Sequence, residues 1–323
     1  MKERHFGRTG LSCSEIGHGT WSMGFMWGPR RDDEAVASLI RSMELGVNFI
    51  DTAYAYGEGH SERLIAKAFQ QVQRRVIVAT KIPPKNMHWP ARHTVPVDQV
   101  FPGEWIIQMT EASLKNLGTD CLDIQQFHVW SDSWIDKGDW LEAVTKLKRS
   151  GKIRWFGVSI NDHEPDSAVK AVASGIIDSV QVIYNIFDQA PEHSLLPLCL
   201  KLGVAVIVRV PFDEGSLTGQ LSPTTTFDKD DWRRSYFTQE RLPETCQRVD
   251  AIRPLVQKAG AKNIAELALR FCLADPAVSV VIPGMRKIQH VEDVARVSDG
   301  RPLTPGLLAN LKRHAWSRNF YPK

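Results

Sequence analysis

The chain has 323 residues, of which 43% are hydrophobic and 24% are charged, and its formal net charge is +3. These values are typical of a folded globular protein, so they exclude disordered and fibrous classes. So small a net charge, without a dense run of Lys and Arg, gives no electrostatic reason to expect a nucleic-acid partner.

Leader and membrane signals are missing from the sequence. The opening residues MKERHFGRTGLS lack the apolar stretch of a signal peptide, and no window reaches the roughly 18 apolar residues of a membrane span. We therefore expect a cytoplasmic protein without a membrane partner. The five cysteines are an odd number with no CxxC spacing, so neither a disulfide framework nor a metal site is predicted.

Short apolar runs rich in β-branched residues recur along the chain. They are apolar on both faces, which is typical of parallel strands covered by helices. After an opening strand near CSEIGHGT (13–20), the runs are VNFID (47–51), RVIVATK (75–81), LDIQQFH (122–128), WFGVS (155–159), SVQVIY (179–184), VAVIVR (204–209) and VSVVI (278–282).

Segments with helical periodicity separate these runs. The first, DDEAVASLIRSMELG, begins with acidic residues and ends at Gly46, and Ser61 is the expected cap of the second. Eight alternating units in a chain of this length predict one (β/α)8 TIM barrel domain over residues 1–323. A doubly wound open sheet is the alternative, but no GxGxxG follows the first strand. Two long connections, 83–103 and 211–237, follow strands and are expected to select the substrate.

Four chemically active side chains fall at the ends of neighbouring strands. Asp51 ends the second strand, Lys81 the third and His128 the fourth, while Tyr56 follows Asp51 by five residues. Because parallel barrel strands end at one face, we expect these residues to converge. A buried Asp51–Lys81 pair would place an ammonium beside Tyr56 and lower its pKa, so that the phenol can exchange a proton. His128 would orient the substrate oxygen.

Each of these residues alone would more often be a surface, capping or core residue. Four such types at matching strand ends are much harder to explain in that way. Tyr54 lies out of phase with Tyr56, so we assign it to packing.

At this point the sequence resembles the aldo-keto reductases over nearly its whole length. FIDTAYAYGEGHSE (49–62), VATK (78–81) and QFH (126–128) are similar to the motifs that carry that family's catalytic residues. The resemblance implies a barrel that uses NADP(H), with Tyr56 as general acid or base, Lys81 and Asp51 tuning it, and His128 guiding the carbonyl. It implies a small-molecule carbonyl or alcohol as substrate.

The same resemblance implies a set of cofactor contacts. GTW (19–21) is similar to the contact with the nicotinamide end, GVSIND (157–162) and Gln181 to the carboxamide anchors, and RVPFDEGSLTG (209–219) to the loop around the pyrophosphate. IPGMRKIQHVEDV (282–294) is similar to the segment that reads the adenosine end. The residues implied are Gly19, Thr20, Trp21, Asp51, Ser159, Asn161, Gln181, Arg209, Pro211, Phe212, Gly215, Leu217, Gly219, Gly284, Met285, Arg286, Lys287, His290 and Asp293.

Several positions depart from the family pattern. Ile160 stands where asparagine is usual, Arg209 replaces a tyrosine that stacks on the nicotinamide, and Gln220 stands where lysine is common. His290 replaces a frequent arginine, and Asp293-Val294 replaces Glu-Asn. Arg286 and Lys287 favour NADP(H) over NAD(H), because both can bind a 2′-phosphate.

The loops that follow the strands are rich in aromatic residues. Such loops would suit a substrate with apolar faces and hydroxyl edges, such as a sugar or a polyketide-like ring. The residues expected at the substrate are Trp21, Tyr56, Trp89, His128 and Trp130. The tail RNFYPK offers little material for a long C-terminal lid.

Two other functions are alternatives. One is a redox-neutral epimerase or dehydratase that retains its nicotinamide. The other is a nucleotide-sensing barrel that binds a partner, resembling the potassium-channel β subunits. The four clustered residues argue against pure binding, and the altered adenosine segment gives only weak support to the redox-neutral reaction.

Overall fold

A computed structural model describes residues 1–24, 31–72 and 74–321 of the protein. Within them, eight parallel strands form one sheet in the order β10-β9-β8-β7-β6-β5-β4-β3. The strands are β3 (His18–Gly19), β4 (Phe49–Asp51), β5 (Ile77–Ile82), β6 (Leu122–Phe127), β7 (Ile153–Ser159), β8 (Ser179–Ile183), β9 (Ala205–Arg209) and β10 (Val278–Val281). Strand order follows chain order, as repeated right-handed β/α units require.

The first and last strands meet, which closes the sheet into a barrel. Bridges pair Ile16 with Val281 and Gly19 with Gly284, both in parallel orientation. The backbone N–H of Gly17 donates to Val281 O at 2.8 Å. A side chain at Gly19 would place its Cβ 2.6 Å from Ile282 O, so only glycine allows the two backbones to lie this close. The predicted (β/α)8 barrel is confirmed.

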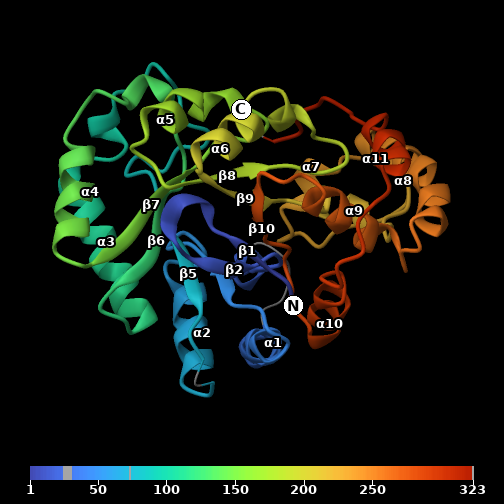
Figure 1. Ribbon diagram of the computed structural model, residues 1–323, viewed down its shortest axis with the longest axis horizontal. Helices are drawn as coiled ribbons and strands as arrows, with labels where there is room; N and C mark the ends of the chain where they lie inside the picture. Colours follow the sequence, from blue (N-terminus) through green and yellow to red (C-terminus); the bar gives the residue numbers. More distant parts are fainter. Residues whose placement is uncertain (25–30, 73, 322–323) are drawn as a thin grey trace.

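Helices surround the strands (Figure 1). They are α1 (Asp32–Glu44), α2 (His60–Phe69), α3 (Gly103–Leu117), α4 (Trp140–Arg149), α5 (Val169–Ser174), α6 (Leu195–Leu202), α7 (Arg233–Tyr236), α8 (Arg241–Lys258), α9 (Ile264–Leu273), α10 (Ile288–Ala295) and α11 (Pro305–Lys312). Apolar faces of most of these helices pack around the strands and form the largest continuous core cluster, while Tyr236 of α7 packs in a separate small cluster.

A hairpin closes the N-terminal end of the barrel. Strands β1 (Glu3–His5) and β2 (Ser12–Ser14) pair antiparallel, and the hairpin crosses the middle of the view in Figure 1. Phe6 and Cys13 from this hairpin pack in one cluster with inward side chains of the barrel such as Phe49 and Ile124. The lower half of the barrel is therefore filled by apolar side chains.

Two local predictions need correction. The opening stretch 13–20 does contain the first barrel strand, β3, but only at its end, and its first residues belong to β2 of the hairpin. Ser61 does not cap α2: the N-cap is Gly59, and the buried Ser61 hydroxyl donates to Thr20 Oγ1 at 2.7 Å. Ser61 thus ties α2 to the loop after β3.

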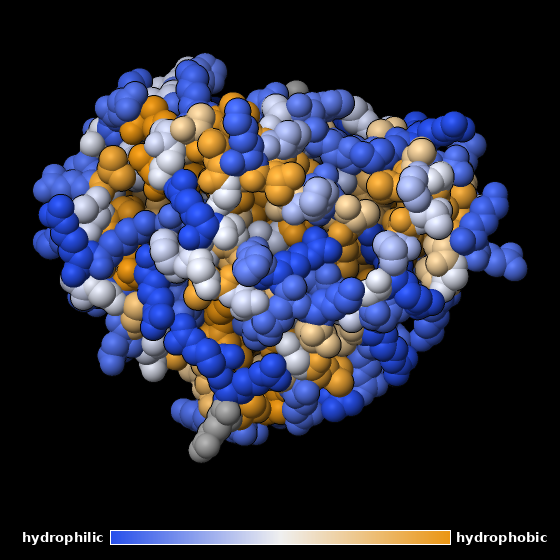
Figure 2. Space-filling model, viewed as in Figure 1, coloured by the Kyte–Doolittle hydropathy of each residue, from blue (hydrophilic) through white to orange (hydrophobic). Residues whose placement is uncertain are grey.

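The outer surface is mixed in character. Figure 2 shows hydrophilic side chains spread among smaller hydrophobic areas on the face seen in Figure 1. Among the described helices we find none with the length and apolarity needed to cross a bilayer. Four of the five cysteines are buried, and none forms a disulfide.

Candidate active site

Alternate residues of each strand point into the barrel, and their character changes along its axis. Toward the N-terminal ends of the strands these inward side chains are apolar, as with Ala79 and Ile207. One step further along the same strands, the inward positions are Lys81 and Arg209, because side chains alternate with a period of two. Asp51 follows Phe49 in the same way. The mouth of the barrel is therefore lined by polar and charged side chains.

Asp51 and Lys81 form a buried ion pair at the centre of this mouth. Lys81 Nζ lies 2.7 Å from Asp51 Oδ1 and donates to Thr52 O at 2.7 Å. Only 1% of the Lys81 side chain and 3% of that of Asp51 are exposed. Burial lowers the pKa of Lys81 and raises that of Asp51, while their mutual contact opposes both shifts.

The hydroxyl of Tyr56 lies directly beside this pair. Lys81 Nζ donates to Tyr56 Oη at 3.4 Å, so the phenol is within reach of the ammonium. Burial raises the pKa of Tyr56 well above its ordinary value, and the negative charge of Asp51 adds to the effect. This direction is opposite to the one expected from Lys81 alone. The phenol is accordingly protonated at neutral pH and can donate a proton.

His128 packs edge-on against Tyr56. The ring centroids lie 5.7 Å apart with an interplanar angle of 73°, and the Trp89 ring centroid lies 5.9 Å from that of His128. Burial lowers the pKa of His128 well below its ordinary value, followed by the positive charges of Lys81 and Arg209. The imidazole is therefore neutral, and one nitrogen can donate a hydrogen bond to a substrate oxygen.

Buried polar atoms without partners line the mouth and offer a place for a carboxamide. Gln181 Nε2 donates to Asp51 Oδ1 at 3.3 Å, while Gln181 Oε1 has no partner among the described residues. Ser159 is 3% exposed on the neighbouring strand, in register with Gln181. An amide N–H of a bound nicotinamide would satisfy Gln181 Oε1, so these residues fit that cofactor.

Two other expected nicotinamide contacts are occupied within the protein. Asn161 Nδ2 donates to Ala91 O at 3.0 Å and to Glu164 Oε2 at 2.8 Å, and its Oδ1 accepts from Ala91 N. Asn161 therefore fixes the loop 83–103 rather than presenting its amide to the mouth. Thr20 is fully buried, and its hydroxyl donates to Asp51 O at 2.9 Å.

Arg209 ends β9 and is held in one orientation. Its Nη2 donates to Asp162 Oδ1 at 2.7 Å and to Ile160 O at 2.9 Å, while Nε is buried without a partner among the described residues. Burial is the largest single influence and opposes the charged form, but the combined effects of Asp162, Tyr321 and Tyr56 outweigh it, so that the pKa of Arg209 is raised. A permanent cation therefore faces the mouth beside Tyr56 and His128.

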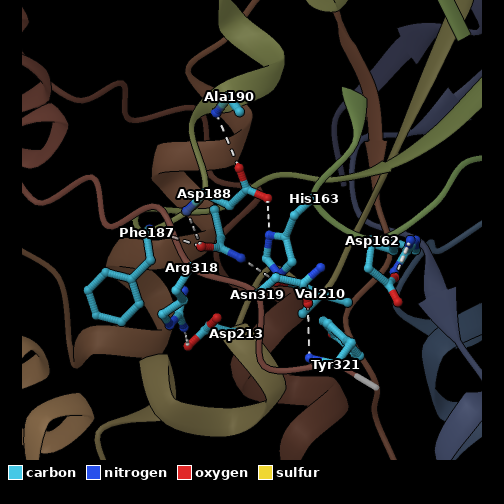
Figure 3. Close-up of polar contacts among 12 residues, drawn as sticks. Asp162, His163, Phe187, Asp188, Ala190, Val210, Asp213, Arg318, Asn319 and Tyr321 are labelled. Atoms are coloured by element: carbon cyan, nitrogen blue, oxygen red, sulfur yellow. Dashed lines mark hydrogen bonds and ion pairs between the residues drawn. The ribbon is translucent and has the colours of Figure 1, made fainter. Parts of the chain in front are cut away.

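The loop after β9 is strained and contains two buried acids. Asp213 and Glu214 are 1% and 5% exposed, and their φ values are 47° and 55°. Aspartate adopts this backbone more readily than most residues do, so the strain falls on Glu214. Burial raises the pKa of Glu214 to about 8. The phenol of Tyr321, near the end of the chain, donates to Glu214. The guanidinium of Arg318 pairs with Asp213 (Figure 3).

The other expected cofactor positions differ in how much of each residue a ligand could contact. Leu217 and Met285 are fully buried in the core, and Pro211 is also buried. Gly215 and Gly219 have φ values of 102° and 74° in the loop after β9, where Phe212 is partly buried. Any role of Leu217 and Met285 would therefore be limited to their backbone.

Basic residues gather at the start of α10. Arg286 is half-buried and Lys287 and His290 are exposed. Burial lowers the pKa of His290, followed by the charges of Lys287 and Arg286, which places all three groups close together. Asp293 lies further along the helix and pairs with Lys262 at 2.8 Å. The arrangement is a cationic helix N-terminus, which suits an anion.

The aromatic side chains separate into two groups. Trp21 packs against Trp232 at 5.3 Å, and Trp232 stacks on Tyr321 at 5.7 Å, so residues from three loops form one aromatic wall. Trp89 is 42% exposed beside His128. The structure does not bring Trp130 to the mouth: it is fully buried and packs against Trp134 and Trp140. Tyr54 packs on the core, as expected.

Sequence reasoning missed the contributions of Asp162, Glu214, Arg318 and Tyr321. The only signal was the unusual acidic pair in RVPFDEGSLTG, which implied that compensating groups must come from elsewhere. No local pattern connected that pair to residues about a hundred positions away. Among the described residues, no cluster of His, Cys, Asp and Glu could hold a metal ion.

Comparisons with known proteins agree with this geometry. The chain is 31% identical to the aldo-keto reductase YhdN of Bacillus subtilis, over 90% of this chain and 86% of that protein. It is 28% identical to the NADH-specific methylglyoxal reductase of Escherichia coli, over 92% and 94% of the two chains.

A solved structure has the same fold. The glycerol dehydrogenase AKR11B4 from Gluconobacter oxydans superposes with a TM-score of 0.79 and 28% identity, covering 97% of this chain and 94% of that one. The family model described as the Aldo/keto reductase family matches residues 15–315. The chain belongs to the aldo/keto reductase family, and it is an oxidoreductase of that family.

Proposed function

We propose that the protein transfers a hydride between NADP(H) and a carbonyl or alcohol carbon of a small organic substrate, with Tyr56 passing the proton. The observation that carries this proposal is the contact of Tyr56 with Lys81, beside the neutral His128. A bound NADPH would supply the hydride. The residues of the chain would then bind, orient and protonate.

In the reduction direction, the neutral imidazole of His128 would donate a hydrogen bond to the carbonyl oxygen. Tyr56 would then give its proton to the oxygen that becomes the alcohol. Lys81 would stabilise the phenolate that remains, because its ammonium lies 3.4 Å from the phenol oxygen. Asp51 would hold Lys81 in this position through the buried pair. Oxidation of an alcohol would reverse these steps.

Gln181 and Ser159 would orient the carboxamide, so that one face of the nicotinamide is turned toward the substrate. Arg209 would lie against the ring from the end of β9. The loop after β9 would hold the pyrophosphate, since the loops after the seventh and eighth strands of such barrels frequently bind phosphate. β9 and β10 occupy those two positions in the barrel.

Preference for NADP(H) is supported by Arg286 and Lys287 at the start of α10. A guanidinium binds phosphate through two hydrogen bonds, and a lysine adds a point charge. One similar protein is named as NADH-specific, so the cofactor preference of this chain requires its own test. Arg286→Met/Lys287→Met should raise the Kd for NADPH roughly a hundredfold if each contact contributes about 1.4 kcal/mol, and should leave that for NADH unchanged. Equal binding of NADPH and NADH by the parent protein would contradict the assignment.

For the substrate, Trp21 and Trp89 would cover apolar faces while His128 and Tyr56 bind the reacting oxygen. We infer a small aldehyde, ketone or sugar. Purified protein with NADPH and a panel of such carbonyls should show loss of the nicotinamide absorbance. Retained nicotinamide with isomerised substrate and no net consumption of NADPH would instead identify a redox-neutral reaction, and a stable complex with a partner would indicate a sensing role.

A further inference from the structure

The last described residues of the chain lie across the loop that follows β9. We refer to residues 316–321 as the C-terminal clamp. The backbone N–H of Trp316 donates to Phe187 O at 2.8 Å, which fixes the start of the clamp to the loop after β8. The guanidinium of Arg318 lies 4.1 Å from the ring centroid of Trp316 and 5.3 Å from that of Phe187. The clamp is therefore packed rather than free.

The loop under the clamp poses an electrostatic problem for the proposed cofactor. A pyrophosphate carries negative charge, yet Asp213 and Glu214 stand in the loop proposed to hold it. Both are buried, so water cannot screen them effectively. An ionised carboxylate in this place would repel the ligand, and its own burial without a partner would be costly.

At Asp213, a guanidinium from the C-terminal clamp balances the negative charge. Arg318 pairs with Asp213 Oδ2, and the side chains are 5% and 1% exposed. Asp213 Oδ2 also accepts from Ser216 Oγ at 2.6 Å. Within the part of the chain that the structure describes, Glu214 has no such ion pair. Burial raises its pKa to about 8, so the carboxyl is mostly protonated at neutral pH, and the Tyr321 phenol donates a hydrogen bond to it. Arg318 thus pairs directly with one of these two buried acids.

The same ion pair acts on strained backbone. Val210, Asp213 and Glu214 all have positive φ, and for a β-branched residue such as Val210 this is a genuine outlier. Such conformations persist only where surrounding contacts fix them. Asn185 Nδ2 holds Val210 O at 3.0 Å on one side of the loop, and Arg318 holds Asp213 on the other.

We propose that Arg318 is a positioning residue of the dinucleotide site: its ion pair with Asp213 cancels the negative charge of the loop, so that the loop can receive the pyrophosphate. The inference rests on the proposed function, since it assumes a dinucleotide in this site. It predicts that the two halves of one ion pair have opposite effects on cofactor binding.

The test measures Kd for NADPH and for NADH by quenching of tryptophan fluorescence in the full-length protein. Arg318→Met should raise both values at least roughly tenfold, the effect of one uncompensated charge about 10 Å away at an effective dielectric constant near 20. Asp213→Asn should not raise either value. The double variant, which has neither charge, should bind within about threefold of the parent, because it removes the repulsion as well as the pair.

Arg313→Met is the matched control. Arg313 is exposed just before the clamp, so loss of its charge should leave both Kd values unchanged. Thermal unfolding of each variant identifies loss of the fold. If Arg318→Met does not fold, Asp213→Asn and the double variant still carry the test.

The outcomes separate the inference from the proposed function. If the parent binds NADPH or NADH and Arg318→Met binds equally well, the inference fails and the proposed function stands. Weakened binding in Asp213→Asn or in the double variant, to the extent expected of Arg318→Met, would show that the pair acts through packing and would also overturn it. If the parent binds neither dinucleotide, both proposals fail.

Discussion

The two ends of the barrel are built from the same strands but from opposite kinds of side chain. At the N-terminal end, Phe49 of β4 and Ala79 of β5 lie in one apolar cluster with Phe6 of the hairpin. At the C-terminal end, the inward positions two residues further on β4 and β5 are the buried pair Asp51 and Lys81. The apolar N-terminal end therefore contributes stability, whereas the C-terminal end keeps charges and unpartnered polar atoms at a cost in stability. Substitutions at the two ends should therefore have separable effects.

The largest effect is expected at the mouth. Tyr56→Phe removes the proton donor but keeps the ring against His128. We expect kcat to fall roughly 10²- to 10⁴-fold, the usual contribution of a general acid, with little change in the melting temperature or in the Kd for NADPH. Steady-state kinetics and cofactor titration would check this. A variant as active as the parent would remove Tyr56 from the proposed mechanism.

Lys81→Met should lower both the stability and the activity of the protein, because it leaves Asp51 buried without its cation and removes the ammonium beside Tyr56. Removal of one partner of a buried pair costs about 3–5 kcal/mol in the free energy of unfolding. Asp51→Asn/Lys81→Met should recover most of that stability, while activity should remain low because no ammonium faces Tyr56. Denaturant unfolding and kcat measurements on the same samples would check both expectations. Recovery of activity in the double variant would contradict the role of Lys81.

Phe6→Ala tests the other end. Phe6 is fully buried against the barrel floor, so its truncation should lower the free energy of unfolding by about 3–5 kcal/mol. The folded fraction should retain the parent kcat, because the mouth is unchanged. Urea unfolding combined with activity per folded molecule gives the comparison. A loss of kcat without loss of stability would show that the two ends do not act separately.

The smallest effect should be a pH dependence of cofactor affinity. Burial raises the pKa of Glu214 to about 8, and the groups that face it are Tyr321, Asp213, Asp162 and Arg209. Below pH 8 the carboxyl is neutral; above it, the carboxylate repels the pyrophosphate, so the Kd for NADPH should rise as pH increases through this value. In Glu214→Gln the affinity should not fall in that window. Measurements of the Kd for NADPH between about pH 6.5 and 9.5 would check this. An equal rise of Kd with pH in Glu214→Gln would count against the role of Glu214.

Much of the fold and of the central site could be predicted from the sequence. The apolar runs and their spacing predicted the barrel, and strand ends placed Asp51, Lys81 and His128 at one face. These inferences work because alternation along a strand and the common direction of parallel strands are local rules. The same rules failed for Trp130, because a residue just past a strand can turn either to the mouth or to the helices.

Residue patterns alone were enough to predict the barrel, the inward-facing residues at its mouth and the family, because its motifs are local. Three features emerged only from the folded arrangement: burial outweighs the nearby ammonium at Tyr56, Asn161 is used by the loop 83–103, and Arg318 reaches Asp213. The physical reason is distance along the chain: desolvation and ion pairing depend on which segments fold together. Residues 105 positions apart share no sequence pattern that reports their contact.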